Sequence, residues 1–247
     1  MTSALLKPLV VVTGASSGFG VEIAKLFSAA GYPLLLVARR LKLMQALNLP
    51  NTLCKEVDVT DYKQFESAVR EAEAVYGKCD LMINNAGVML LEKIWDQDIE
   101  EWHRMLEVNL KGVMNGHKIV MRDMIDRRHG TVINVSSIAG RKSFGNHAAY
   151  CATKFGVHAL SETVREEAAP YNVRVMVVAP GAAETELLGH STNESIVEGY
   201  KSWKASTLDQ GISLDPVHIA SSCKFMYEMP QEVNIRELVL ASTKQNA

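Results

Sequence analysis

Cysteine is scarce in this chain. Its 247 residues include four cysteines, Cys54, Cys79, Cys151 and Cys223. None forms a C-x-x-C pair, and no histidine stands beside them at metal-ligand spacing. This pattern argues against a zinc site, so we expect no metal. It favours reduced, mostly buried thiols, as in cytoplasmic proteins.

Long hydrophobic runs and an excess of one charge are also missing. The N-terminal stretch MTSALLKPLVVVTG has only a short apolar run, and nothing approaches the roughly 20 residues that span a bilayer. The net charge is −2, and basic residues are scattered apart from short pairs such as Arg39-Arg40 and Arg127-Arg128. We therefore expect a soluble, cytoplasmic protein that binds neither membrane nor nucleic acid. A small, weakly acidic or neutral molecule is the expected partner.

No repeat, low-complexity tract or linker divides the chain, so we expect one domain over residues 1–247. Short β-branched or leucine-rich runs predict strands at Leu9–Val12, Pro33–Ala38, Leu81–Ile83, Thr131–Val135, Val173–Ala179 and Ile235–Leu240. Longer segments predict helices at Gly18–Ala30, Asp61–Tyr76, Ile99–Arg127, Ala148–Ala169 and Pro216–Glu228. Continuous apolar strands alternating with helices indicate a parallel sheet covered on both faces. The predicted fold class is α/β, a doubly wound Rossmann-type sheet.

The stretch 186–214 departs from this alternation. It is long and polar, and it contains three glycines together with Tyr200 and Trp203. Such an insertion after a strand is either a lid over a site or an irregular surface loop. We take the substrate lid as the working hypothesis.

The segment Thr13–Gly20, TGASSGFG, fits two motifs. Its first part satisfies G-x-S-x-G, the nucleophile elbow of serine hydrolases, with Ser16 as nucleophile. Its glycines also suit a strand-to-helix turn that admits a pyrophosphate, although G-x-x-x-G-x-G differs from the G-x-G-x-x-G fingerprint. An elbow serine needs a base, an acid and donors from an earlier loop, yet only one strand precedes Ser16. The phosphate turn is therefore favoured, with Ser16 and Ser17 as hydrogen-bond donors.

Two arginines follow the second predicted strand, in LLLVARR. A carboxylate near this place would bind the ribose 2′-hydroxyl of NAD, whereas an arginine accommodates the 2′-phosphate of NADP. Guanidinium groups meet phosphate with charge-assisted hydrogen bonds. Arg39 and Arg40 therefore predict NADP(H), against the alternative that they are a solvated strand end.

Tyr150 and Lys154 stand four residues apart in a predicted helix, YCATK. Residues at this spacing share a helix face, so the phenol and the ammonium group point into one cleft. A nearby cation favours the phenolate and lowers the tyrosine pKa towards the range of a general acid or base. Y-x-x-x-K is common by chance, so the pair indicates a catalytic site only together with other motifs in the chain.

Together with other motifs in the chain, the pair resembles the motif set of the short-chain dehydrogenase/reductase (SDR) family. The matching positions, in order, are Thr13–Gly20, Asn84–Gly87, Asn109, Ser136-Ser137, Tyr150/Lys154 and Pro180-Gly181. The segments INNAGVMLL, SSIAG, HAAYCATKFGVHA and VNIRELVLASTKQ are similar to an NADP(H)-dependent subgroup that includes clavulanate dehydrogenase and NADPH-binding blue fluorescent proteins. The resemblance implies an oxidoreductase that transfers a hydride between NADP(H) and a carbonyl or alcohol.

The resemblance also implies a role for each catalytic position. Tyr150 would donate a proton to the carbonyl oxygen or remove one from an alcohol. Ser137 would hydrogen-bond the same oxygen. Lys154 would lower the tyrosine pKa and hold the nicotinamide ribose, and Asn109 would hold a water that connects Lys154 to solvent.

The cofactor is expected to contact residues after five strands. Besides Tyr150 and Lys154, they are Gly14, Ser16, Ser17, Gly18, Phe19 and Gly20 at the first turn, Arg39 and Arg40 after the second strand, Asp58 and Val59 near adenine, Asn85, Ala86 and Gly87, and Pro180, Gly181 and Thr185 at the nicotinamide end. Substrate is expected to face Met89, Leu90, Phe144, His147, Ala183, Leu187, Leu188, His190, Tyr200 and Trp203. Most of the latter are apolar or amphipathic, which indicates a medium-sized carbonyl compound.

The helices at 99–127 and 148–169 carry more apolar residues than one stripe needs. In the family such helices build dimers and tetramers, so we expect a homo-oligomer, a homotetramer in the first place. Two other functions stay open at this point. One is an NADPH-binding blue fluorescent protein with slow or secondary catalysis, and the more remote one is a serine hydrolase that uses Ser16.

Overall fold

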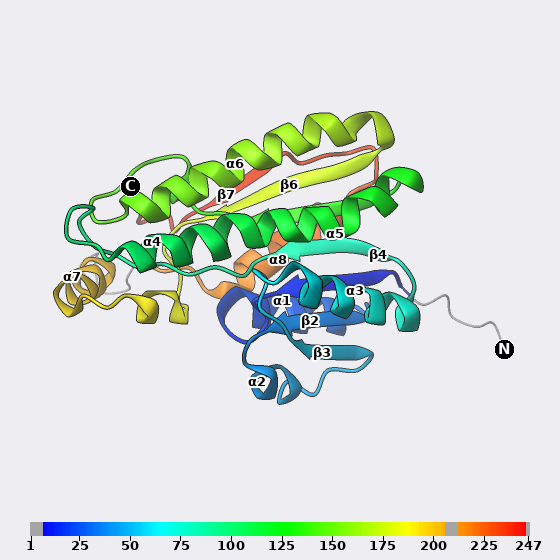
Figure 1. Ribbon diagram of the computed structural model, residues 1–247, viewed down its shortest axis with the longest axis horizontal. Helices are drawn as coiled ribbons and strands as arrows, with labels where there is room; N and C mark the ends of the chain where they lie inside the picture. Colours follow the sequence, from blue (N-terminus) through cyan, green and yellow to red (C-terminus); the bar gives the residue numbers. More distant parts are fainter. Residues whose placement is uncertain (1–6, 206–211, 246–247) are drawn as a thin grey trace.

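The structure is a computed structural model that describes residues 7–205 and 212–245. Seven parallel strands form one sheet in the order β3-β2-β1-β4-β5-β6-β7 (Figure 1). They are β1 (Leu9–Thr13), β2 (Leu34–Ala38), β3 (Thr52–Glu56), β4 (Cys79–Asn84), β5 (Gly130–Val135), β6 (Val173–Pro180) and β7 (Glu237–Leu240). The predicted α/β, Rossmann-type fold is confirmed.

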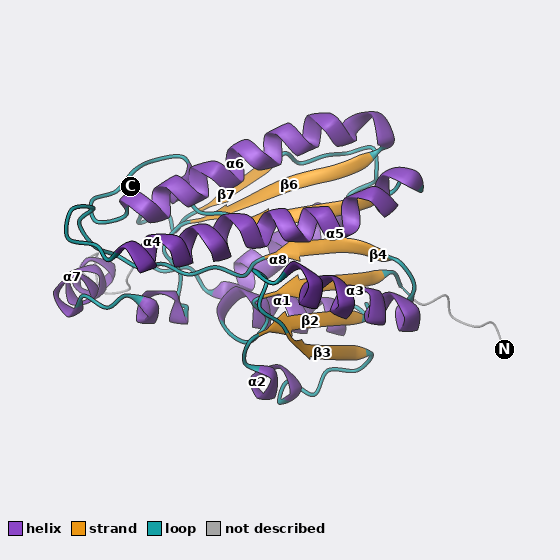
Figure 2. Cartoon of the chain, viewed as in Figure 1, coloured by secondary structure: helices purple, strands orange, loops and turns teal. Residues whose placement is uncertain are grey.

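Helices cover both faces of the sheet (Figure 2). The α-helices are α1 (Gly18–Ala29), α2 (Leu41–Gln45), α3 (Tyr62–Tyr76), α4 (Ile99–Leu106), α5 (Gly112–Asp126), α6 (Ala148–Ala168), α7 (Glu194–Ala205) and α8 (Pro216–Glu228). Short turns of other helix types are η1 (Glu107–Lys111), η2 (Ile138–Gly140), η3 (Ala169–Tyr171) and η4 (Glu186–His190). Within the described residues, no helix combines the length and the apolar character that crossing a bilayer requires.

Two hydrophobic clusters hold the layers together. Alternate residues of a strand point to opposite faces, and in β1 Val10 and Val12 pack on one side while Leu9 and Val11 pack on the other. The first cluster includes α1 and α8, with Phe27 fully buried. The second includes α3, α5 and the end of α6. Because both faces are covered, the central strands read as continuous apolar runs, which is why the sequence predicted them.

The strand order changes direction at β1, which pairs with β2 on one side and with β4 on the other. The turn after β1 and the loop after β4 therefore leave adjacent strands towards opposite faces of the sheet. A crevice forms at the carboxyl ends of strands at such a point. This edge of the sheet carries the candidate site, and α7 lies beyond it (Figure 1).

The edge strand β3 and the short helix α2 were not among the elements predicted from sequence runs. Residues of β3, TLCKE, are only partly buried because β3 pairs with β2 alone. An edge strand needs no continuous apolar run. The strand signal was therefore too weak at this position.

The helix predicted over 99–127 is interrupted. Between α4 and α5 the chain forms a π-helical turn, η1, whose central residue Asn109 is fully buried. Gly112 follows it, and a Cβ there would lie 2.8 Å from Val59 Cγ2. Such turns are frequent at functional sites in helices.

The lid predicted over 186–214 contains two ordered elements, η4 and α7. Residues 206–211 of that range lie outside the described residues. All four cysteines are free thiols, three of them buried and Cys54 half-buried, which agrees with the prediction of reduced thiols.

Candidate active site

A cavity of about 800 Å³ opens at the carboxyl edge of the sheet. Its volume falls in the range of about 300–1,000 Å³ that is usual for small-molecule sites. It runs from the turn after β1 to the inner side of α7, so cofactor and substrate positions predicted separately share one space. Among the described residues, no group of three or more histidine, cysteine, aspartate or glutamate side chains is placed to hold a metal ion.

Most predicted site residues line this cavity, and three do not. Gly20 and Asn109 lie behind its wall, and Leu90 is buried in the cluster beneath it. Gly20, expected to contact the cofactor, and Leu90, expected to contact substrate, thus support the wall, and Asn109, expected in the proton relay, lies outside the lining. Leu91, one position further, lines the cavity instead.

The first turn has the backbone that a phosphate cradle requires. Gly14 and Gly18 have φ of +66° and +52°, a region that side chains disfavour. A Cβ at Gly14 would lie 2.8 Å from Ala86 Cα. The turn opens directly into the N-terminus of α1, where free N–H groups attract an anion. These features fit a pyrophosphate.

The loop after β4 is tied to this turn by side chains. The Thr13 hydroxyl accepts hydrogen bonds from the backbone N–H groups of Asn85 (2.9 Å) and Ala86 (3.0 Å). Asn85 Nδ2 donates in return to the Thr13 carbonyl at 2.8 Å. The Asn85 amide nitrogen is thus occupied by the protein, and its first task is to hold the two loops in register.

Gly20 offers a test of this packing. A Cβ there would lie 2.3 Å from the Gly14 carbonyl oxygen and 2.8 Å from Ala15 Cα, both of them backbone. We expect Gly20→Ala to lower the free energy of unfolding by about 1–3 kcal/mol and to weaken NADPH binding, because the turn must shift. Urea unfolding and NADPH titration measure the two effects. Gly189→Ala is the matched control, since a Cβ at Gly189 meets nothing within 4 Å. Normal NADPH binding by Gly20→Ala would contradict the cradle.

The arginines after β2 reach the same turn. Arg40 Nε donates to the Ser16 hydroxyl at 3.2 Å, and Arg40 Nη1 pairs with Glu186 Oε2 at 2.9 Å. Arg39 is exposed and lines the cavity beside it. Asp58, which also lines the cavity, accepts a hydrogen bond from the Thr60 N–H at 2.9 Å. Two guanidinium groups thus face the end of the cavity where the adenosine is expected.

The surroundings of Ser16 do not support the hydrolase interpretation. Its hydroxyl accepts a hydrogen bond from a guanidinium, and a guanidinium cannot take up a proton. A serine nucleophile needs a base at this place. Ser16 instead sits at the phosphate turn, as a hydrogen-bonding group.

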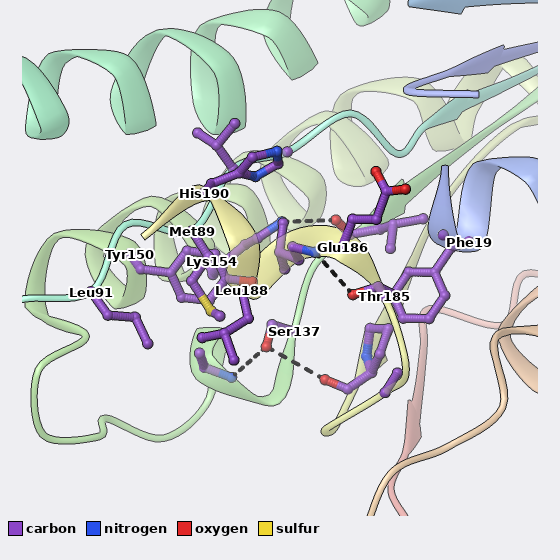
Figure 3. A pocket seen from close by; sticks show the side chains of 18 of the residues that line it. Phe19, Met89, Leu91, Ser137, Tyr150, Lys154, Thr185, Glu186, Leu188 and His190 are labelled. Carbon is purple, nitrogen blue, oxygen red and sulfur yellow. Dashed lines mark hydrogen bonds between the residues drawn. The ribbon is translucent and has the colours of Figure 1, made fainter. Parts of the chain in front are cut away.

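Tyr150, Ser137 and Lys154 come together at the other end of the cavity (Figure 3). Tyr150 and Lys154 lie one turn apart on α6, each with a relative exposure of 5%. Lys154 Nζ is 5.7 Å from the Tyr150 ring centre and donates to the Val135 carbonyl at 3.1 Å. Ser137 Oγ donates to the Pro180 carbonyl at 3.4 Å and hydrogen-bonds the Tyr150 phenol.

Burial dominates the protonation of this group. It raises the pKa of Tyr150 above its ordinary value, and the hydrogen bond from Ser137 offsets only part of this rise. Burial also lowers the pKa of Lys154 to about 8. Desolvation of the phenolate outweighs the other influences on the Tyr150 pKa, and the lowering of this pKa by Lys154 stays a prediction.

The Asn109 side chain is fully engaged by the protein, and the water-holding role expected for this residue stays a prediction. Its Oδ1 accepts from the Val88 N–H at 2.8 Å, while its Nδ2 donates to the Val88 carbonyl at 2.8 Å and to Thr153 Oγ1 at 3.2 Å. Its Oδ1 would lie 3.3 Å from a Cβ at Gly87. The amide thus fixes the loop after β4 against α6, directly beside Lys154.

The substrate end is built from aromatic rings. Phe144, His147, Tyr200 and Trp203 follow one another with ring centres 5.3–6.1 Å apart, and His147 lies 6.3 Å from Tyr150. Burial lowers the pKa of His147, and its Nδ1 contacts the Gly145 carbonyl at 2.6 Å. Since a carbonyl only accepts, Nδ1 carries the proton and Nε2 remains an acceptor.

Sequence reasoning missed several residues of the wall, among them Leu91, Ile196, Glu186, Lys204 and Gln245. Gln245 Oε1 accepts from the Ala182 N–H at 3.0 Å across 63 residues. Glu184, paired with Lys204 at 3.1 Å, joins α7 to the loop after β6. None of these contacts has a local motif that could reveal it.

A buried polar chain beneath the site was also missed. Asn84 Nδ2 donates to Asn134 Oδ1 at 2.9 Å, and Asn134 Nδ2 lies 2.9 Å from His117 Nε2 and 2.8 Å from Ser161 Oγ. Burial lowers the pKa of His117 to about 4, so its ring is neutral. The chain links β4 and β5 to α5 and α6; Asn109 lies in η1, directly before α5, and Tyr150 lies on α6.

Comparison with known proteins assigns the class. Residues 8–195 match the short chain dehydrogenase family. The chain is 34% identical over 248 residues to an uncharacterized oxidoreductase of Staphylococcus saprophyticus, covering 96% of this chain and 97% of the relative. It is 35% identical over 235 residues to an NAD-dependent glycerol dehydrogenase of Listeria innocua, covering 94% and 85%. The chain belongs to the short-chain dehydrogenase/reductase family and is an oxidoreductase.

Solved structures agree with this class. A closed form of serine dehydrogenase complexed with NADP+ superposes with a TM-score of 0.88 at 27% identity, covering 97% of this chain and 96% of that one. An alcohol dehydrogenase from the archaeon Thermococcus sibiricus, complexed with 5-hydroxy-NADP, gives 0.81 at 27% identity, covering 97% and 98%. An NAD(P) cofactor is therefore the group that this fold and cavity accommodate.

Proposed function

We propose that this enzyme is an NADPH-dependent carbonyl reductase, reversibly an alcohol dehydrogenase. The observation that carries the proposal is the placement of Tyr150, Ser137 and Lys154 in the same cavity as the glycine turn. Two hydroxyl donors and a cation at one end, and an anion cradle at the other, suit hydride transfer from a dinucleotide to a carbonyl. The cofactor supplies the hydride, and the protein supplies position and protons.

The chain's own residues fit that cofactor. The turn at Gly14–Gly18 and the N-terminus of α1 would hold the pyrophosphate, with Ser16 and Ser17 donating to it. Asp58 and Val59 would border the adenine, and Pro180, Gly181 and Thr185 the nicotinamide. Gly87 lines the cavity close to Lys154, since a Cβ at Gly87 would lie 3.8 Å from Lys154 Nζ.

Tyr150 is set up as a proton donor. Its raised pKa keeps the phenol protonated near neutral pH, which is the form that reduction of a carbonyl needs. Hydride delivery builds negative charge on the carbonyl oxygen, so Tyr150 and Ser137 together stabilise that charge.

Lys154 would return a proton to Tyr150 after each turnover. Burial brings its pKa to about 8, so it gives up a proton readily near neutral pH. The Asn109 side chain is occupied by Val88 and Thr153. A water that joins Lys154 to solvent would therefore use the backbone carbonyl of Asn109 in the π-helical turn.

The cofactor preference follows from the residues after β2. Arg39 and Arg40 stand where a carboxylate would bind the ribose of NAD, although one relative is named as NAD-dependent. We expect Arg39→Ala to weaken NADPH binding about 10–100-fold, the loss of a charge-assisted hydrogen bond, and to leave NADH binding nearly unchanged. Titration of the protein fluorescence with each cofactor measures both constants. Lys42→Ala, one turn away on α2, is the control for loss of a nearby positive charge. Equal losses for the two cofactors would refute the 2′-phosphate site.

The substrate would be a neutral carbonyl compound with an apolar or aromatic body. Phe144, Tyr200 and Trp203 offer ring faces, and Lys204, which also lines the cavity, is paired with Glu184. His147 Nε2 adds one acceptor for a substrate hydroxyl or amide. A screen of aromatic and aliphatic aldehydes and ketones for NADPH consumption tests this choice.

Two finer predictions remain open to experiment. Apolar side chains on α4, α5 and α6 are exposed, including Leu106, Met114 and Phe155, and they support the predicted homotetramer; light scattering tests it. The similarity to NADPH-binding blue fluorescent proteins predicts stronger emission from bound NADPH, which a spectrum with added protein tests. Four free thiols fit the predicted cytoplasmic location.

A further inference from the structure

Arg40 is held by a carboxylate from the lid. Its Nη1 lies 2.9 Å from Oε2 of Glu186, the first residue of η4, while its Nε donates to Ser16 in the phosphate turn. The two ion-pair partners are 146 residues apart in sequence. This ion pair therefore joins the expected 2′-phosphate site to the segment that covers the substrate end.

The end of the cavity that carries Arg39 and Arg40 also carries a carboxylate, that of Glu186, which contacts Arg40. The same charges act on the neighbouring His190. Burial lowers the pKa of His190, and the guanidinium groups of Arg104, Arg39 and Arg40 lower it further, whereas the Glu186 carboxylate raises it. A phosphate that approached Arg40 would meet the Glu186 carboxylate at hydrogen-bond distance from the same guanidinium. Two anions at one cation repel each other.

The lid start also touches the phosphate turn directly. A Cβ at Gly18 would lie 3.2 Å from Thr185 Cγ2, so Thr185 packs on the turn. After Glu186 come Leu187 and Leu188, which pack against the cluster that contains Tyr150. Figure 3 shows Leu188 and Tyr150 in the same cavity. A change in the partner of Arg40 therefore acts on a segment that reaches both ends of the cavity.

We propose that Glu186 is a specificity-determining residue that competes with the 2′-phosphate of NADP for Arg40. NADP binding displaces the carboxylate and frees the start of η4, whereas NAD, which has no 2′-phosphate, leaves the ion pair in place. This inference rests on the proposed NADP(H) dependence. It adds that the preference for NADP is held below its maximum by a residue of the lid.

The size of the effect follows from exposure. The side chains of Arg40 and Glu186 are 47% and 61% exposed, and exposed ion pairs are weak and screened by salt. We expect Glu186→Gln to tighten NADP+ binding about two- to fivefold at low salt, the range that follows from such pairs. The gain should shrink as salt is raised.

The test is a double-mutant cycle on NADP+ and NAD+ binding, measured by calorimetry on the full chain. It compares the wild type, Glu186→Gln, Arg40→Ala and the double variant. Glu184→Gln is the matched control, because Glu184 is 70% exposed, lies two residues away and pairs with Lys204 instead. Competition predicts tighter NADP+ binding in Glu186→Gln alone, little change for NAD+, and no gain from Glu186→Gln when Arg40 is already alanine.

Other outcomes overturn the proposal in distinguishable ways. Weaker NADP+ binding in Glu186→Gln would mean that the carboxylate positions Arg40 for the phosphate. An equal gain for both cofactors, or a gain that persists without Arg40 or appears in Glu184→Gln, would reduce Glu186 to a general repulsive charge. Unchanged NADP+ binding in Glu186→Gln also refutes the competition, while the proposed function stands. Failure of the wild type to bind NADP+ would refute both.

Discussion

Tyr150→Phe should lower the turnover number for any accepted carbonyl by about 10²- to 10⁴-fold, the usual contribution of a general acid. Phenylalanine keeps the ring that fills the buried site and removes only the phenolic hydroxyl group, whose hydrogen-bond partner is Ser137. NADPH binding should change little, because the glycine turn and the arginines after β2 lie at the other end of the cavity. NADPH consumption with a carbonyl found in the screen gives turnover, and a fluorescence titration gives binding.

The control is Tyr171→Phe, which makes the same chemical change at an exposed position in η3, outside the cavity. It should retain full turnover. Retention of activity by Tyr150→Phe would refute the catalytic assignment. Parallel loss of NADPH binding in that variant would show that the phenol acts through cofactor binding instead.

Sequence reasoning reached the architecture because the central strands are buried on both faces. Leu9–Thr13 and Val173–Pro180 are buried at every position, so their apolar runs are unmistakable. The glycines of the first turn were also legible, since positive φ at Gly14 and Gly18 leaves little choice of residue. The same reasoning failed at β3, where an edge strand pairs on one side only.

The site was predictable where its chemistry is local in sequence and hidden where it depends on distant contacts. Tyr150 and Lys154 share one helix face, so spacing alone placed them together. The Arg40–Glu186 ion pair joins segments 146 residues apart, and no pattern near either residue announces it. The rise of the Tyr150 pKa could not be predicted for a related reason: it depends on burial by the whole cavity wall, which a four-residue spacing does not contain.

Lys154 should make the stability of this enzyme depend on pH in a defined way. Burial lowers its pKa to about 8 from an ordinary 10.5, so between these values the unfolded chain binds more protons than the folded one. Stability therefore rises with pH across this window, and below about pH 8 the folded state carries the full cost of a buried cation. The difference between the two pKa values corresponds to roughly 3 kcal/mol.

Lys154→Met tests this, because methionine has a similar volume and no charge. The wild type should gain roughly 3 kcal/mol in its free energy of unfolding relative to the variant between pH 7 and a pH near 10.5. Urea unfolding at both ends of the window measures the difference, and contributions from groups that Lys154 does not influence cancel. Lys25→Met, which removes a half-exposed ammonium group, should not reproduce it. The difference at pH 7 alone is smaller, since the variant also leaves the Val135 carbonyl without its donor.

The same substitution separates stability from catalysis. If Lys154 had only a structural role, the folded variant would keep its activity. If Lys154 returns protons to Tyr150, the variant is stable but its turnover is slow. We expect Lys154→Met to lose about 10²-fold or more in turnover, the scale of acid–base catalysis, while remaining folded at pH 7. Full turnover in the folded variant would contradict the proton route. Burial of the Lys154 cation lowers the stability of the folded enzyme, and an apolar residue would fill the same place without this loss. We therefore attribute the lysine to proton transfer with Tyr150.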